Sequence, residues 1–102
     1  MWKNPNPQNN FEAQTISLSK NINNYKYAIV GVAPSSTRAP MNNIVVPNIE
    51  CCLTTNIESF RTRTVTLKNN TAIFGDGYFT NSYNTNQAVN NTVCIPQYIY
   101  GI

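Results

Sequence analysis

The alternation of short strand-like segments with asparagine-rich turns constrains the fold of this chain more than any other feature. No segment of ten or more of the 102 residues has the apolar spacing of an amphipathic helix. Six or more short segments either alternate polar and apolar residues or are rich in β-branched and aromatic residues, which is typical of strands. Asparagine, at 18 positions, separates several of them, and it suits turns because it tolerates positive φ.

The clearest strand signals lie in the interior of the chain. Residues 25–33 are nearly continuously apolar, which predicts a central strand covered on both faces. Residues 60–67 predict a second strand, and residues 71–74 return as its hairpin partner after an Asn-rich turn. The remaining strand segments are 14–19, 78–80 and 92–100.

Two prolines interrupt segments that otherwise have strand composition. Pro47 divides residues 43–55, for which we expect either two short strands or one bent strand. Pro96 falls within residues 92–100 and marks a sheet edge or a bulge.

Residues 1–13 predict an extended N-terminal arm. Pro5 and Pro7 fix φ twice and remove two backbone donors. Trp2 and Phe11 would each bury about 150–250 Å², so we expect the arm to pack against the domain. The length allows one domain over residues 1–102, and the strand pattern predicts a small antiparallel β-sandwich of jelly-roll-like type.

Composition excludes several classes of function. Only 11% of the residues are charged, the net charge of +3 is dispersed, and there is no histidine. Nucleic-acid binding needs a basic stripe, so it is not expected. No apolar run approaches the ~20 residues that span a bilayer, and no secretory signal follows Met1. No cofactor or metal is expected.

The cysteines Cys51, Cys52 and Cys94 form no recognisable motif. An odd number excludes a complete disulfide framework, and zinc sites need paired spacings that are missing here. Adjacent cysteines on a strand point to opposite faces. We expect all three to be small buried hydrophobic residues in a reducing cytoplasm.

Six segments of the sequence, taken in order, are similar to a known family: residues 2–7, 11–18, 25–32, 60–67, 73–78 and 94–102. They match a W-x-N-x-x-P opening, an A-Q-T-I-x-L strand, a Y-x-x-x-I/V strand and an I-P-x-x-I-Y-G-I ending. The chain thereby resembles the C-terminal tip module of bacteriophage tail, baseplate or head-fibre structural proteins from phages of gut Firmicutes. The resemblance implies a virion location after assembly in the bacterial host cytoplasm, other virion proteins as partners, and a homotrimer.

One polar loop is the first candidate binding site. Between Tyr78 and Asn91 it carries amides and a tyrosine, which suit neutral sugars because an amide both donates and accepts. Tyr78 fits the core better than the site, whereas Tyr83 fits an exposed binding role and a structural one equally. The candidate ligand-binding residues are Asn81, Tyr83, Asn84, Asn86 and Gln87.

Arg61 and Arg63 are the second candidate site. At positions i and i+2 they share one strand face, where they would grip an anionic glycan or phosphate, or pair with Glu50 or Glu58 of a neighbouring subunit. Val65 shares that face, which is therefore mixed and is expected to meet solvent or another subunit. This face and the apolar C-terminal strand predict a homotrimer.

Three functions compete on these grounds. The first is a tip domain that attaches to host cell-surface carbohydrate. The second is a non-adhesive capsid decoration or fibre cap. The third, a polysaccharide depolymerase, would need two carboxylates, but Glu12, Glu50 and Glu58 have no catalytic context and Asp76 is a turn residue between glycines. We therefore expect a binding protein rather than an enzyme.

Overall fold

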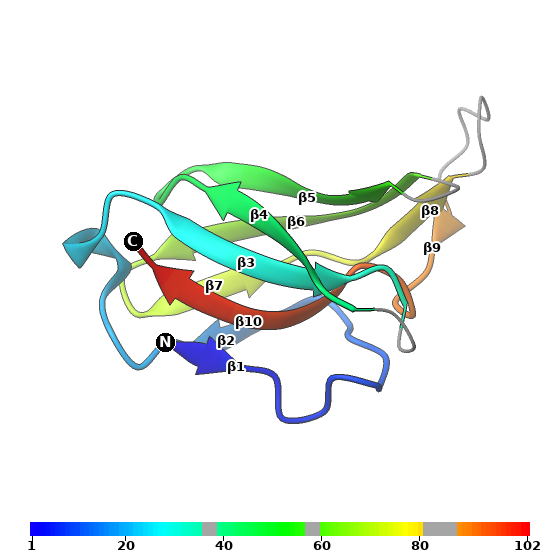
Figure 1. Cartoon of the computed structure of the whole chain (residues 1–102), viewed down its shortest axis with the longest axis horizontal. Coiled ribbons are helices and arrows are strands. Elements are labelled where there is room, and N and C mark those ends of the chain that lie inside the picture. The colour runs from blue at the N-terminus through cyan, green and yellow to red at the C-terminus, as the bar shows by residue number, and fades with distance from the viewer. Residues whose placement is uncertain (36–38, 57–59, 81–87) are drawn as a thin grey trace.

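Two antiparallel sheets pack face to face in the computed structural model, which describes residues 1–35, 39–56, 60–80 and 88–102 (Figure 1). The first sheet has four strands in the order β1 (Trp2–Lys3), β10 (Ile95–Gly101), β3 (Ala28–Ala33) and β4 (Met41–Val45). This architecture confirms the predicted small antiparallel β-sandwich.

The second sheet is centred on β6 (Phe60–Lys68). Along one edge β6 pairs with β5 (Glu50–Asn56), and along the other it pairs first with β8 (Tyr78–Thr80) and then with β7 (Thr71–Phe74). The outer strands are β2 (Gln14–Ser17), which pairs with β7, and β9 (Ala88–Val89), which pairs with β8.

The sequence signals for the main strands are confirmed. Strand β3 lies between β10 and β4, with Val30 and Val32 fully buried on the core side. On the other side the Tyr98 ring covers Gly31 so closely that an added Cβ would lie 2.2 Å from it. The predicted β6–β7 hairpin forms, with Asn69 at φ 54° in its turn.

The two prolines act differently. Pro47 separates β4 from β5, so the alternative of two short strands is the observed one. Pro96 lies at a bulge, where the register of β10 against β3 shifts. Strand β10 is internal rather than an edge, because the short strand β1 pairs with its other side.

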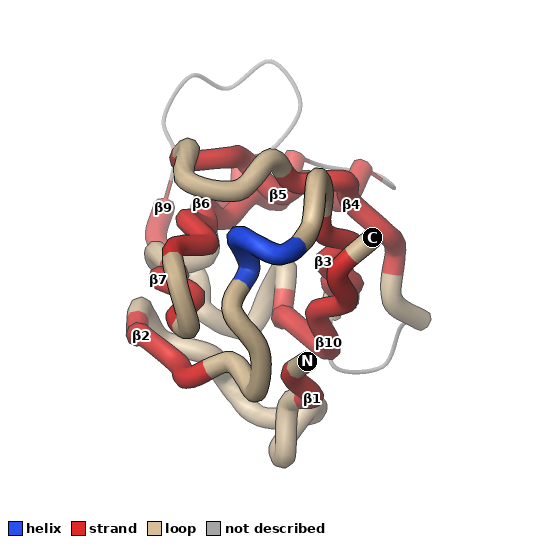
Figure 2. The backbone as a smooth tube through the Cα atoms, turned by 90° about the vertical axis from the view of Figure 1, so that its left-hand side faces the viewer, coloured by secondary structure: helices blue, strands red, loops and turns tan. Residues whose placement is uncertain are grey.

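A 3₁₀ turn, η1 (Ile22–Asn24), closes one end of the sandwich (Figure 2). Asn21 caps it by accepting a hydrogen bond from the Asn23 amide at 2.9 Å. Ile22 is fully buried in the core, and its amide donates to the Asn69 carbonyl at 2.8 Å. No helix among the described residues is long and apolar enough to cross a membrane.

The predicted orientation of β6 is wrong. Its mixed face is the core face, with Arg63, Val65 and Leu67 all at 1% exposure or less. The arginine is tolerated there because backbone carbonyls accept its N–H groups. This face is therefore not free to meet another subunit.

The cysteines follow their strand positions. Cys51 packs against the core and Cys52 is exposed, so the predicted opposite orientation is confirmed while the predicted burial of Cys52 is wrong. Cys94 is fully buried, and all three thiols are free. Burial raises the pKa of the Cys94 thiol to about 12, despite the lowering effect of the nearby Arg63 cation.

Candidate functional site

The predicted loop site lies outside the described residues. Asn81, Tyr83, Asn84, Asn86 and Gln87 all fall within residues 81–87. Tyr78, at the start of β8, is partly buried.

Arg61 and Arg63 share one face of β6, as predicted, but they do not form a joint anion site. The Arg61 guanidinium donates to the Pro34 carbonyl at 2.9 Å and lies 5.6 Å from the centre of the Phe79 ring. Arg63 is inside the core at 1% exposure, so a ligand on the surface does not reach it. Burial lowers the pKa of Arg63, and the nearby Asp76 charge opposes that shift.

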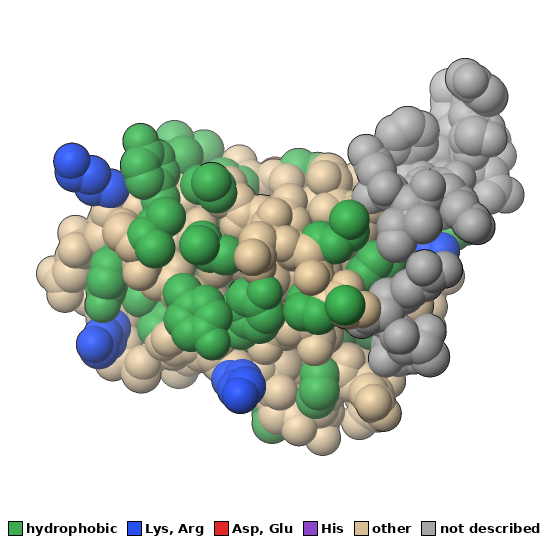
Figure 3. All heavy atoms as spheres, viewed as in Figure 1, with side chains coloured by type: hydrophobic (Ala, Val, Ile, Leu, Met, Phe, Trp, Pro, Cys, Tyr) green, Lys and Arg blue, Asp and Glu red, His purple; other side chains and the backbone are tan. Residues whose placement is uncertain are grey.

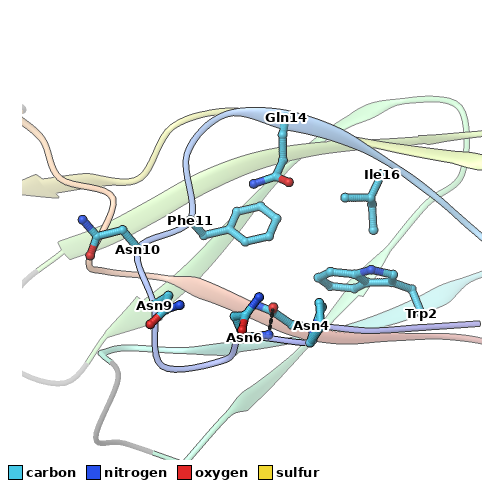
Figure 4. A pocket seen from close by; sticks show the side chains of 9 residues that line it. Trp2, Asn4, Asn6, Asn9, Asn10, Phe11, Gln14 and Ile16 are labelled. Carbon is cyan, nitrogen blue, oxygen red and sulfur yellow. Dashed lines mark hydrogen bonds between the residues drawn. The ribbon is translucent and has the colours of Figure 1, made fainter.

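A cavity of about 270 Å³ lies instead between the N-terminal arm and β2 (Figure 4). None of the described residues that line it is charged. It is lined by Trp2, Asn4, Pro5, Asn6, Asn9, Asn10, Phe11, Gln14 and Ile16.

Asn4 anchors the arm that forms one wall of this arm pocket. Its side-chain amide donates to the Pro96 carbonyl at 2.7 Å, and its backbone amide donates to the Gln97 carbonyl at 2.9 Å. Its side-chain oxygen accepts from the Asn6 amide at 2.8 Å, which turns the chain after Pro5 (Figure 4). Asn4 is consequently 9% exposed, and both ends of its amide are engaged within the protein.

The Trp2 and Phe11 rings form the base of the pocket, and the buried Phe74 ring connects them to the core. The ring centres of Trp2 and Phe11 are 6.1 Å apart, and each also contacts Phe74, at 5.9 and 5.2 Å. Phe11 meets both partners edge to face, a favourable geometry for aromatic pairs. The predicted packing of the arm through Trp2 and Phe11 is thus confirmed.

Hydrogen bonds to a distant turn fix the position of Phe11. Its amide donates to the Asn91 carbonyl at 3.0 Å, and two residues later the Ala13 amide donates to an Asp76 carboxylate oxygen at 3.1 Å. The Asn91 side chain joins these anchors, since it donates to Asp76 at 3.2 Å and accepts from the Gly77 amide at 2.8 Å. The predicted turn at Asp76 is wrong, because β7 and β8 both run antiparallel to β6 and the chain does not reverse between them. Asp76 instead tethers the arm through the Ala13 amide.

The rim of the pocket offers neutral hydrogen-bonding groups. The exposed side-chain amides of Asn6, Asn9 and Asn10 have no hydrogen-bond partner among the described residues. Gln14 donates to the Glu12 carbonyl at 3.1 Å, which leaves its own side-chain oxygen as an acceptor. Figure 4 shows these amides around the space that the Trp2 and Phe11 rings border.

The groups that line the pocket are aromatic and aliphatic carbon and neutral amides. The described lining contains no carboxylate, thiol or cation that would transfer a proton or bind a charged group. In the described ranges there is also no group of three or more His, Cys, Asp or Glu side chains placed to hold a metal ion.

This pocket was not among the predicted sites. Trp2 and Phe11 were expected to anchor the arm by packing, and the asparagines of the arm had no predicted role. The available signal was compositional, because Asn4, Asn6, Asn9, Asn10 and Gln14 crowd around two aromatic residues within the first 14 positions.

Comparison of the chain with protein-family models, with curated proteins and with solved structures finds no match.

Proposed function

We propose that this chain is a non-enzymatic attachment domain that binds a neutral carbohydrate in the arm pocket. The observation that carries the proposal is the combination of an aromatic base, Trp2 and Phe11, with a rim of unpaired amides. A sugar ring has an apolar face, which packs on aromatic carbon, and hydroxyl groups at its edge, which exchange hydrogen bonds with amides.

The size of the pocket limits the ligand. At about 270 Å³ it is slightly smaller than the ~300–1,000 Å³ of typical small-molecule sites. It therefore suits a single sugar ring, such as the end of a glycan chain, rather than a long polysaccharide segment. Glycoside hydrolysis generally uses two carboxylates flanking the scissile bond, so the uncharged lining favours binding over cleavage.

The biological setting of the proposal comes from the family resemblance. A tip module on a phage tail, baseplate or head fibre would attach the virion to host cell-surface carbohydrate. Single-ring sites of this kind are weak, and several copies on one particle would supply the strength through avidity. A homotrimer within the virion suits that use and is part of the proposal.

The experiment is a fluorescence titration, since Trp2 is the chain's single tryptophan and lines the pocket. The probes are glucose, galactose, rhamnose and N-acetylglucosamine, with glucuronic acid as a charged comparison. We expect saturable changes in Trp2 emission with at least one neutral sugar and weaker binding of the acid. Asn24→Ala serves as the control variant, because Asn24 is exposed and does not line the pocket.

Absence of a saturable response to every neutral sugar would reject the proposal. Specific attachment of the purified chain to phage capsids or fibres, without sugar binding, would instead support the decoration or capping function. Release of reducing sugar from a polysaccharide would establish a depolymerase.

A further inference from the structure

Arg63 is a buried cation that the proposed binding of a neutral sugar does not directly use. It lies on the core face of β6 at 1% exposure, and among the described residues no carboxylate forms an ion pair with it. Burying a charge is costly, and apolar replacements of similar volume are often equally stable. A role in stability alone therefore accounts poorly for an arginine at this place.

The guanidinium joins two segments that are far apart in the sequence. Nη1 donates to the Gly75 carbonyl at 2.7 Å, Nε donates to the Cys94 carbonyl at 2.9 Å, and Nη2 donates to the Val93 carbonyl at 3.2 Å. Only the planar fork of arginine reaches three acceptors in this way.

These two segments are the ones that hold the arm. Gly75 directly precedes Asp76, which accepts from the Ala13 amide. Val93 lies two residues after Asn91, whose carbonyl accepts from the Phe11 amide. The spacing is tight, since a Cβ added at Gly77 would lie 2.8 Å from Nη2 of Arg63.

The same guanidinium also contacts the pocket's aromatic base. Its central carbon lies 5.3 Å from the centre of the Phe11 ring, within the range of a cation–π interaction. The contact is desolvated, because Arg63 and Phe11 are both buried. Arg63 therefore acts on Phe11 twice, through the ring and through the segments that bind the arm's backbone.

We infer that Arg63 is a positioning residue for the arm pocket: it holds the Phe11 ring, and with it the arm, in the geometry that receives the ligand. For its effect on sugar affinity the inference rests on the proposed function. Its effect on the geometry of the pocket is measured without any ligand.

The test compares Arg63→Lys with Arg61→Lys. Both arginines lie on the same face of β6, donate to backbone carbonyls and lie over a phenylalanine, but Arg61 contacts Phe79, which does not line the pocket. Two quantities are measured on folded protein: quenching of Trp2 fluorescence by acrylamide, and the Kd for the best neutral sugar of the titration. We expect Arg63→Lys to raise the quenching constant and to weaken sugar binding about tenfold, the effect of losing a charged hydrogen bond from the planar guanidinium to the segments that hold the arm. Arg61→Lys should change neither.

A double-mutant cycle with Phe11→Leu shows whether the effect passes through the ring. If it does, adding Arg63→Lys to Phe11→Leu weakens binding less than it does in the wild type. Should Arg63→Lys fail to fold, Arg63→Met, which keeps the volume without the donors, takes its place in both measurements.

A folded Arg63 variant with wild-type quenching and wild-type Kd would overturn the inference, as would equal effects of Arg61→Lys. If the wild type binds no sugar, the proposed function fails, and the quenching comparison alone decides whether Arg63 positions the arm.

Discussion

The two open sides of the sandwich are closed in different ways. Where β4 meets β5, the Asn43 side chain accepts from the Thr54 amide at 3.2 Å and donates to the Thr54 carbonyl at 3.4 Å. A side-chain amide carries the same donor and acceptor as a peptide group. Asn43 therefore pairs with the edge of β5 much as another strand would. It occupies a backbone N–H and C=O that could otherwise pair with a strand of another chain and cause aggregation.

On the opposite side, β1 and β2 belong to different sheets and do not pair with each other (Figure 2). One backbone hydrogen bond connects the residue before β1 with the segment after β2: the Ser19 amide donates to the Met1 carbonyl at 3.1 Å. The remaining gap is spanned by aromatic side chains and covered by the arm. Rings fill such a gap less completely than backbone pairing, and the result is a cavity with an apolar base.

The outer face of the first sheet differs from both of these sides, because no other part of the described chain covers its apolar side chains. The outer face of the first sheet exposes Tyr27, Ile44, Tyr100 and Ile102. Figure 3 shows hydrophobic side chains over β10, β3 and β4, with Lys or Arg at the margin and no acidic side chain among the described residues in view. This face, unlike the buried face of β6, leaves several large apolar side chains uncovered in the single chain.

Removing the Phe11 ring, which fills the side of the sandwich near the arm, should lower the free energy of unfolding the most. Phe11→Ala deletes a buried ring that contacts Trp2, Phe74 and Arg63, and we expect the free energy of unfolding to fall by about 3–5 kcal/mol. Phe11→Leu keeps most of the volume and should cost less than about 1.5 kcal/mol. Urea denaturation measures both. Similar small losses for the two variants would show that the arm adds little to the core.

The buried thiol gives the next largest effect, which appears at high pH. The folded pKa of Cys94 is about 12, whereas an unfolded thiol has a pKa near ~8.5. Between these values the unfolded chain loses a proton that the folded chain retains, so the free energy of unfolding falls by about 1.4 kcal/mol per pH unit. Below pH ~8.5 the thiol is protonated in both states, so the Cys94 contribution to the free energy of unfolding is fully present there.

Cys94→Ala isolates this term from tyrosine and lysine titration. Urea denaturation at pH 7.5, 9.5 and 10.5 should show the wild type losing stability faster than the variant as the pH rises. Parallel pH profiles would mean that the Cys94 thiol ionises in the folded chain as readily as in the unfolded one.

The sequence predicts the strands far better than it predicts the site. Strand identity follows from local patterns, as in residues 25–33 and 60–67, and the breaks follow from Pro47 and Pro96. The local pattern does not predict which face of β6 is buried, because a face that contains an arginine is expected to be exposed. The three carbonyls that accept its N–H groups come from residues 75, 93 and 94, and only the folded chain brings these together.

The arm pocket escapes sequence reasoning for a related reason. Asparagine serves turns, strand edges and binding sites equally well, and its role depends on its partners. The Asn4 side chain donates to the Pro96 carbonyl and the Asn43 side chain binds the Thr54 backbone, whereas the side chains of Asn9 and Asn10 have no partner among the described residues. Nothing in the local sequence separates these cases.

The side closed by Asn43 should show an intermediate effect on stability and none on binding. Asn43→Ala removes two long, exposed hydrogen bonds to Thr54, and we expect a loss of about 1 kcal/mol in urea denaturation. Thr54→Ala is the control, since it keeps the backbone groups that Asn43 binds. Sugar affinity, read from Trp2 emission, should stay at the wild-type value. A weaker sugar affinity in Asn43→Ala would show that the two sides of the sandwich are coupled.

The smallest effect on stability, and the sharpest contrast with Asn43, is expected for the amides at the rim of the pocket. The side chains of Asn9 and Asn10 are exposed and have no hydrogen-bond partner among the described residues, so the double variant Asn9→Ala/Asn10→Ala should change the free energy of unfolding by less than about 0.5 kcal/mol. Its sugar affinity should nevertheless fall about tenfold, because each amide supplies hydrogen bonds only to the ligand. Denaturation and the Trp2 titration on the same samples give both numbers. Unchanged affinity would mean that these two asparagines contact only solvent, and it would leave the aromatic base with Asn6 and Gln14 as the site.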